Sequence, residues 1–87
     1  MYRLKLHKRV VKFIESRNPK DKLRIKEKFL YLQNNPYPSN PQTDTKNMSN
    51  STNGFRLRVG NYRFLYDVVE DELIIYIEKA DNRGDIY

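Results

Sequence analysis

The sequence predicts a single small α+β domain, residues 1–87, in which an N-terminal strand and a two-helix hairpin pack on one face of a small antiparallel β-sheet. Three observations predict this fold. Apolar residues recur at helical spacing in two stretches before residue 35. A strictly alternating stretch begins at Phe55 and leads into a Gly-Asn turn signal. A chain of 87 residues has room for only one modest core, because domains of this size bury about 60–65% of their unfolded surface.

The first 35 residues predict a strand followed by two helices. Residues 2–6 alternate between apolar and basic side chains, which indicates a short strand. Residues 7–17 carry apolar side chains at helical spacing and form the first predicted helix. Asn18 is a good N-cap and Pro19 suits the first position of a second helix. Asn34-Asn35-Pro36 ends that helix.

Residues 36–54 are rich in Pro, Asn, Ser and Thr, and predict a long loop that includes Lys46. Loops of this length in small domains are often functional. The stretch from Phe55 onward predicts an antiparallel meander of three strands: residues 55–59, 62–69 and 73–77. Gly60-Asn61 is the predicted turn of the first hairpin.

A two-residue turn at Gly60-Asn61 sets the register of the first hairpin. Val59 then lies opposite Tyr62, and Arg58 lies opposite Arg63. Because side chains alternate along a strand, one face carries the apolar residues and must be the core face. Its predicted members are Phe55, Leu57, Val59, Tyr62, Phe64, Tyr66 and Val68.

The opposite face of the predicted hairpin carries Arg56, Arg58 and Arg63. One interpretation is a solvated outer face. If the pairing is extended through a turn at Glu70-Asp71, Glu78 lies opposite Arg63 and neutralises it. This leaves Arg56 and Arg58 without a predicted partner. The other interpretation is an anion site, because the arginine fork donates two hydrogen bonds to phosphate oxygens and keeps its charge.

The C-terminal segment contains two more candidate residues for the anion site, Arg83 and Tyr87. We expect the chain to fold back after the third meander strand, which would return Arg83 toward the arginines. The alternatives are an ion pair of Arg83 with Asp81 or Asp85, and a frayed end at Tyr87.

Composition narrows the classes of function. The chain has 17 Lys and Arg against 11 Asp and Glu, a net charge of +6, no cysteine and one histidine, His7. Disulfides, thiol catalysis and cysteine or histidine-cluster metal sites are therefore excluded, and we expect neither a metal nor another cofactor. No apolar run approaches a membrane span, so a cytoplasmic protein with an anionic partner is expected. The basic surplus lies in residues 1–35, whereas residues 36–87 have six basic and eight acidic side chains.

Two blocks of the sequence resemble the RelE/ParE toxin superfamily. Residues 54–66, GFRLRVGNYRFLY, resemble its "YRLRVGDYRVLY" block, and residues 82–87, NRGDIY, resemble its closing "HRxDVY" block. The predicted order of elements matches that of the family over nearly the whole chain. The sequence departs from the family at Asn82, where many members have His or Lys, and has arginine at Arg56 and Arg58, where many have lysine.

The resemblance implies the toxin of a type II toxin–antitoxin pair. In its RelE branch, the toxin cleaves messenger RNA in the ribosomal A site by metal-free attack of a 2′-hydroxyl on the adjacent phosphate. The implied catalytic residues are Arg56, Arg58, Arg63, Arg83 and Tyr87. The implied RNA-binding residues are the same four arginines and Lys46.

Two other functions stay open on the same fold: a ParE-like inhibitor of DNA gyrase, and a domain that binds RNA or a protein partner without catalysis. Each toxin-like function implies a cognate antitoxin whose acidic or amphipathic segment wraps the toxin, and allows a heterotetramer with it. The nuclease additionally implies the ribosome with its messenger RNA as a partner.

Overall fold

The computed structural model describes residues 1–48 and 54–82, and confirms the predicted order of elements with one additional strand. In chain order the elements are β1 (Arg3–Leu6), α1 (Lys8–Glu15), α2 (Pro19–Asn34), β2 (Asp44–Asn47), β3 (Gly54–Val59), β4 (Tyr62–Val69), the 3-10 turn Glu70–Glu72 and β5 (Ile74–Asn82). Within the described ranges, no helix is long and apolar enough to cross a membrane.

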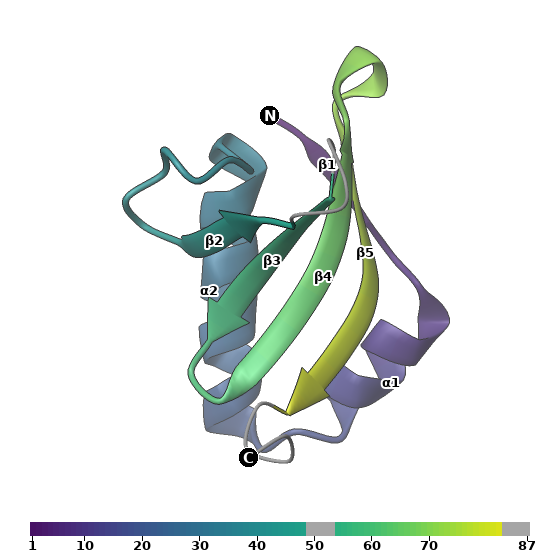
Figure 1. Cartoon of the computed structure of the whole chain (residues 1–87). Coiled ribbons are helices and arrows are strands. Elements are labelled where there is room, and N and C mark those ends of the chain that lie inside the picture. The colour runs from purple at the N-terminus through teal and green to yellow at the C-terminus, as the bar shows by residue number, and fades with distance from the viewer. Residues whose placement is uncertain (49–53, 83–87) are drawn as a thin grey trace.

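The five strands form one sheet in the order β1-β5-β4-β3-β2. Strands β2 to β5 pair antiparallel, but β1 pairs parallel with β5, so the sheet is mixed rather than wholly antiparallel as expected. Parallel pairing needs a long connection, and here most of the chain separates the two strands. Figure 1 views the sheet from its uncovered side, with α2 passing behind β3 and β4 and α1 beside the lower part of β5.

Helix α2 begins at its predicted cap, and α1 begins at a side-chain cap that the sequence did not indicate. The Asn18 side chain accepts a hydrogen bond from the backbone N–H of Asp21 at 2.8 Å, and Pro19 occupies the first turn of α2. The His7 side chain caps α1 by accepting from the backbone N–H of Arg9 at 3.1 Å. The Tyr62 hydroxyl donates to Asp21, so the start of α2 is tied to the start of β4.

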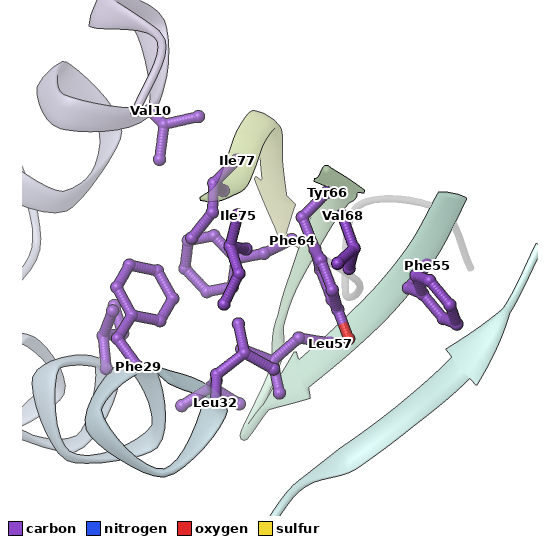
Figure 2. Packing of buried hydrophobic residues seen from close by; sticks show 12 residues of the cluster. Val10, Phe29, Leu32, Phe55, Leu57, Phe64, Tyr66, Val68, Ile75 and Ile77 are labelled. Atoms are coloured by element: carbon purple, nitrogen blue, oxygen red, sulfur yellow. The ribbon is translucent and has the colours of Figure 1, made fainter. Parts of the chain in front are cut away.

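The core lies between the helices and the face of the sheet that the alternation predicted. Figure 2 shows Val10 of α1 and Phe29 and Leu32 of α2 facing the buried side chains of the strands. Of the seven predicted core residues six are buried, and Tyr62 is half-buried against the core. Phe64 is fully buried and meets the ring of Phe29 edge-to-face, with 5.1 Å between the ring centroids.

The predicted register of the β3–β4 hairpin is confirmed at every pair. Val59 lies opposite Tyr62 and Arg58 lies opposite Arg63. Gly60 has a φ of +60°, a left-handed conformation that glycine adopts without strain. A Cβ at this position would also approach a guanidinium nitrogen of Arg24 to 2.9 Å.

The predicted register of the β4–β5 pair is wrong. Arg63 lies opposite Asp81, not Glu78. The connection uses the whole segment 70–73, with Leu73 at a positive φ of 52°, and is longer than the assumed Glu70-Asp71 turn. A β-bulge then adds one residue on β5, because Tyr66 pairs with Ile77 whereas Leu65 pairs with Lys79.

The segment predicted as one long loop contains strand β2, which pairs with β3 at the edge of the sheet. Its sequence DTKN carries no apolar alternation, so the pattern did not reveal it. The preceding turn is organised by the buried Asn40, whose side chain donates to the carbonyls of Tyr31 and Asn35 and accepts from the backbone N–H of Gln42.

A second polar anchor joins three distant parts of the chain. The hydroxyls of Tyr2 and Tyr37 both donate to the Glu70 carboxylate, with 2.7 Å between the Tyr2 oxygen and Oε1. These two donors lower the pKa of Glu70, and the hydrogen bond to Glu70 raises the pKa of Tyr37.

We predict that Phe64→Ala lowers the free energy of unfolding by about 3–5 kcal/mol, because it leaves a large cavity at the centre of the core. Urea unfolding followed by circular dichroism measures the change. Leu23→Ala is the control, since Leu23 is 69% exposed and its truncation should cost less than about 0.5 kcal/mol. Equal losses in the two variants would contradict the described core.

We predict that Glu70→Ala lowers the urea midpoint at pH 7 and by much less at pH 3. The folded-state pKa of Glu70 lies below its usual value of 4.5. Its contribution to stability is therefore complete above that value and is lost as the pH falls through the folded-state pKa. Glu72→Ala in the same turn is the control. A Glu70→Ala loss that is independent of pH would contradict the prediction.

Candidate functional site

The uncovered face of the sheet gathers the basic residues that the sequence singled out. Lys46 on β2 lies opposite Arg56 on β3, and Arg58 on β3 lies opposite Arg63 on β4. Paired residues share a face of the sheet, so these four side chains form one surface, here called the arginine face. It lies on the side toward the viewer in Figure 1, where no helix covers the strands.

One row across this face runs Asp44, Arg58, Arg63 and Asp81, in four adjacent strands. The two arginines occupy its centre and the two carboxylates its ends. Like charges directly opposite each other destabilise a strand pair by up to about 1 kcal/mol, so the flanking carboxylates offset part of the cost of this pairing.

The carboxylates form ion pairs with two of the arginines. Arg63 Nε and Nη2 approach the two Asp81 carboxylate oxygens at 3.2 and 3.3 Å, a bidentate arrangement. Arg56 Nη2 lies 3.4 Å from Asp44 Oδ1, and the Arg56 side chain is only 12% exposed. Arg56 therefore has a carboxylate partner, contrary to the expectation from sequence.

Arg58 differs from Arg56 and Arg63 in its ion pairing. Its side chain is half-buried, and its Nε is buried without a hydrogen-bond partner among the described residues. Within the same residues it forms no ion pair shorter than 4.0 Å, although Asp44 lies opposite it. No described carboxylate forms an ion pair with the half-buried Arg58 guanidinium, so its charge is available to an anionic ligand.

A second row adds further positive charge. It runs Lys46, Arg56, Leu65 and Lys79, and contains no carboxylate. Because neighbouring strands lie about 4.8 Å apart, the charges of the two rows form one basic surface. The arginine fork matches the oxygens of phosphate and of carboxylate, so phosphate is one anion that this surface suits.

The register reveals three residues of this surface that sequence reasoning missed or misassigned: Asp44, Lys79 and Asp81. Asp44 lies in a strand that no pattern indicated, and Lys79 and Asp81 depend on a bulge that is not visible in the sequence. The sequence suggested Asp81 only as a possible partner of Arg83, whereas the structure shows its ion pair with Arg63. Arg83 and Tyr87 lie outside the described residues.

Two carboxyl groups lie close together on the same face of the sheet, at Asp67 and Glu78. A hydrogen bond to Asp67 raises the pKa of Glu78, partial burial raises it further, and the nearby Arg9 opposes both effects. Across residues 1–48 and 54–82, no group of three or more His, Cys, Asp or Glu side chains is placed to hold a metal ion.

Comparison with known proteins relates this chain to one family of toxins through both a family model and a curated relative. The family model for the ParE toxin of the type II toxin–antitoxin system parDE matches residues 4–87. A curated protein of Methanocaldococcus jannaschii named RelE1 is 33% identical over 86 residues, which cover 99% of this chain and 94% of the relative.

Solved structures agree with the sequence relationship. A chain of the archaeal RelE-RelB complex from Pyrococcus horikoshii OT3 superposes with a TM-score of 0.83 at 32% identity, covering 95% of this chain and 96% of that one. A chain of the RelB-RelE antitoxin-toxin complex from Methanococcus jannaschii has a TM-score of 0.72 at 29% identity, covering 94% and 93%. The resemblance expected from the two sequence blocks is thus confirmed, and the chain belongs to the RelE/ParE superfamily of toxins from type II toxin–antitoxin systems.

Proposed function

We propose that this chain is a ribosome-dependent endoribonuclease that cleaves messenger RNA in the A site and thereby inhibits translation. The 2′-hydroxyl of the RNA attacks the adjacent phosphorus, the bond to the 5′-oxygen breaks, and the products carry a 2′,3′-cyclic phosphate and a 5′-hydroxyl. The reaction needs no metal if side chains stabilise the charge and move the protons.

One observation carries the proposal: Arg58 lies half-buried at the centre of the arginine face and forms no ion pair shorter than 4.0 Å among the described residues. Donors that are already oriented toward a developing negative charge stabilise a transition state at little cost of reorganisation. We assign to Arg58 and Arg63 the binding of the scissile phosphate, because they lie opposite each other in adjacent strands.

Asp44 and Asp81 orient two of the arginines without blocking them. An exposed ion pair contributes about 0–1 kcal/mol, so a phosphate that binds bidentately can compete for the same guanidinium. Asp81 is 45% exposed and Asp44 is 61% exposed, so both carboxylates can turn toward solvent when RNA binds. Arg56 and Lys46 then hold neighbouring phosphates of the strand.

The proton transfers are assigned to the C-terminal segment. Arginine does not release its proton near neutral pH, so the arginine face alone supplies no general base. We assign the deprotonation of the 2′-hydroxyl to Tyr87 and the stabilisation of the leaving oxygen to Arg83. A tyrosine has a usual pKa of about 10, so this role requires positive charge close enough to favour its deprotonated form.

The relatives named above were solved with an antitoxin, and we propose a cognate antitoxin as the regulatory partner of this chain. An acidic or amphipathic segment would neutralise the arginine face and exclude RNA from it. A heterotetramer of two toxins and two antitoxins is the assembly that we propose.

The matching family model carries the ParE description, which makes inhibition of DNA gyrase the second candidate function. A gyrase inhibitor acts by binding protein and has no need of two arginines placed opposite each other to hold a phosphate. The arrangement of Arg58 and Arg63 therefore favours the nuclease.

We predict that Arg58→Ala reduces the rate of message cleavage at saturating ribosomes by about 100- to 1,000-fold, because one donor to the developing charge is lost. Arg58→Lys should recover part of the rate, since it restores the charge without the bidentate fork. Primer extension on translated messages with purified ribosomes measures both. Arg24→Ala, on the exposed surface of α2, is the matched control and should cleave at the wild-type rate.

Two outcomes would overturn the nuclease. Growth arrest that survives both Arg58→Ala and Arg63→Ala, with gyrase–DNA cleavage complexes accumulating, would assign the chain to the ParE-like function. Binding of ribosomes or RNA without cuts in any translated message would leave a domain that binds its partner without catalysis.

We predict that Tyr87→Phe lowers the maximal cleavage rate by about 100-fold or more, because a general base typically accelerates a reaction by about 100- to 10,000-fold. Phenylalanine keeps the aromatic ring but lacks the hydroxyl, so the substitution tests the hydroxyl alone. The rate is measured against pH at saturating ribosomes. An unchanged rate and pH profile would show that the hydroxyl is not the base.

A further inference from the structure

A second site lies beside the arginine face, where β1 ends and β5 continues. Strand β1 pairs with β5 only as far as Leu6 and Ile77, after which the chain turns into α1. Figure 1 shows β5 running on past this point while the chain of β1 turns away from it. The space left beside β5 is a hollow of about 580 Å³, here called the Tyr76 hollow.

The hollow combines an aromatic ring with positive charge. The Tyr76 side chain is 39% exposed and lies opposite Lys5 across the β1–β5 pair. Lys5 Nζ lies 5.6 Å from the centre of the Tyr76 ring. Arg9 and Lys79 also line the hollow, and among the described residues none of these three cations forms an ion pair shorter than 4.0 Å.

The hollow adjoins the arginine face directly. Lys79 lines the hollow and also ends the row that runs from Lys46 through Arg56 and Leu65. Arg56 and Lys79 lie two strands apart, a distance of about 10 Å across the sheet. A strand of RNA whose phosphate sits on the arginine face can therefore reach the hollow within a few nucleotides.

The charges that line the hollow favour a nucleotide over an acidic peptide. Glu78 lies in it, beside Asp67, and the pair holds negative charge among the cations. This charge repels the side chains of an acidic peptide. A nucleotide meets both signs, because its phosphate binds cations while the amino group of its base donates to a carboxylate.

We propose that the Tyr76 hollow binds one nucleotide of a single-stranded RNA, with the base stacked on Tyr76 and its phosphate on Lys5, Arg9 and Lys79. Exposed aromatic rings in basic grooves bind single-stranded bases in this way. Lys5 is exposed, and the rotatable bonds of its four-carbon chain let its ammonium move from above the ring to the phosphate when the base stacks. The choice of RNA as the ligand rests on the proposed function.

The test measures binding without cleavage. The probe is a short fluorescein-labelled RNA whose 2′-hydroxyls are methylated, so that it cannot react, and binding is followed by fluorescence anisotropy at low salt. Tyr76→Ala should weaken binding by about 5- to 100-fold, the range for loss of one stacked base. Tyr76→Phe should bind within about twofold of the wild type, because the ring is kept.

Tyr31→Ala is the matched control. Tyr31 lies on α2 with Lys28 Nζ at 5.5 Å from its ring centre, so it has the same aromatic–cation pairing but does not line the hollow. Its loss should leave RNA binding unchanged. Circular dichroism checks that each variant is folded.

Three results would overturn the proposal: no binding of the methylated RNA by the wild type, an equal effect of Tyr76→Ala and Tyr31→Ala, or binding of poly-glutamate that depends on Tyr76 as strongly as RNA binding does. The last would assign the hollow to an acidic protein. Because the probe cannot be cleaved, Tyr76-dependent binding without ribosomal cleavage would refute the proposed nuclease and leave the nucleotide site standing.

Discussion

The two-residue turn at Gly60-Asn61 is the constraint on which the rest of the molecule depends. It fixes the register of β3 against β4, and the period of two then divides the side chains of both strands between the faces of the sheet. A slip of one residue would bury Arg58 and Arg63 and expose Phe64. The burial of the aromatic face against α2 therefore holds the arginines on the opposite face, and core and site are two results of one pairing.

Local signals predicted the parts of the fold that local chemistry determines. The caps at Asn18 and Pro19, the hairpin register and the core face all follow from residues near each other in the chain, and the structure confirms them. Strand β2 was missed because an edge strand is stabilised by its backbone pairing with β3 and needs no apolar pattern of its own. The parallel pairing of β1 with β5 depends on how the helices cross the sheet, which no local pattern reports.

The candidate site was predictable in its residue types and less so in its charges. Alternation placed Arg56, Arg58 and Arg63 together correctly, but their partners lie on strands whose register depends on the missed strand and on the bulge at Glu78. The bulge moves Asp81 opposite Arg63 and leaves Glu78 beside Asp67. The longer connection at 70–73 shifts the pairing by two residues and the bulge shifts it by one more, so a pairing extended from the assumed two-residue turn places Glu78 instead of Asp81 opposite Arg63.

The distribution of charge explains how so small a domain can carry a site of this kind. Three arginines on two adjacent strands oppose folding, and Asp44 and Asp81 offset the repulsion at the two ends of the row. If the carboxylates lay at the centre, they would neutralise the arginines and leave no cation for a phosphate. With the carboxylates at the ends, Arg58 in the middle forms no ion pair among the described residues. The sheet therefore tolerates the arginines at a small cost in stability while the centre of the row stays open to an anion.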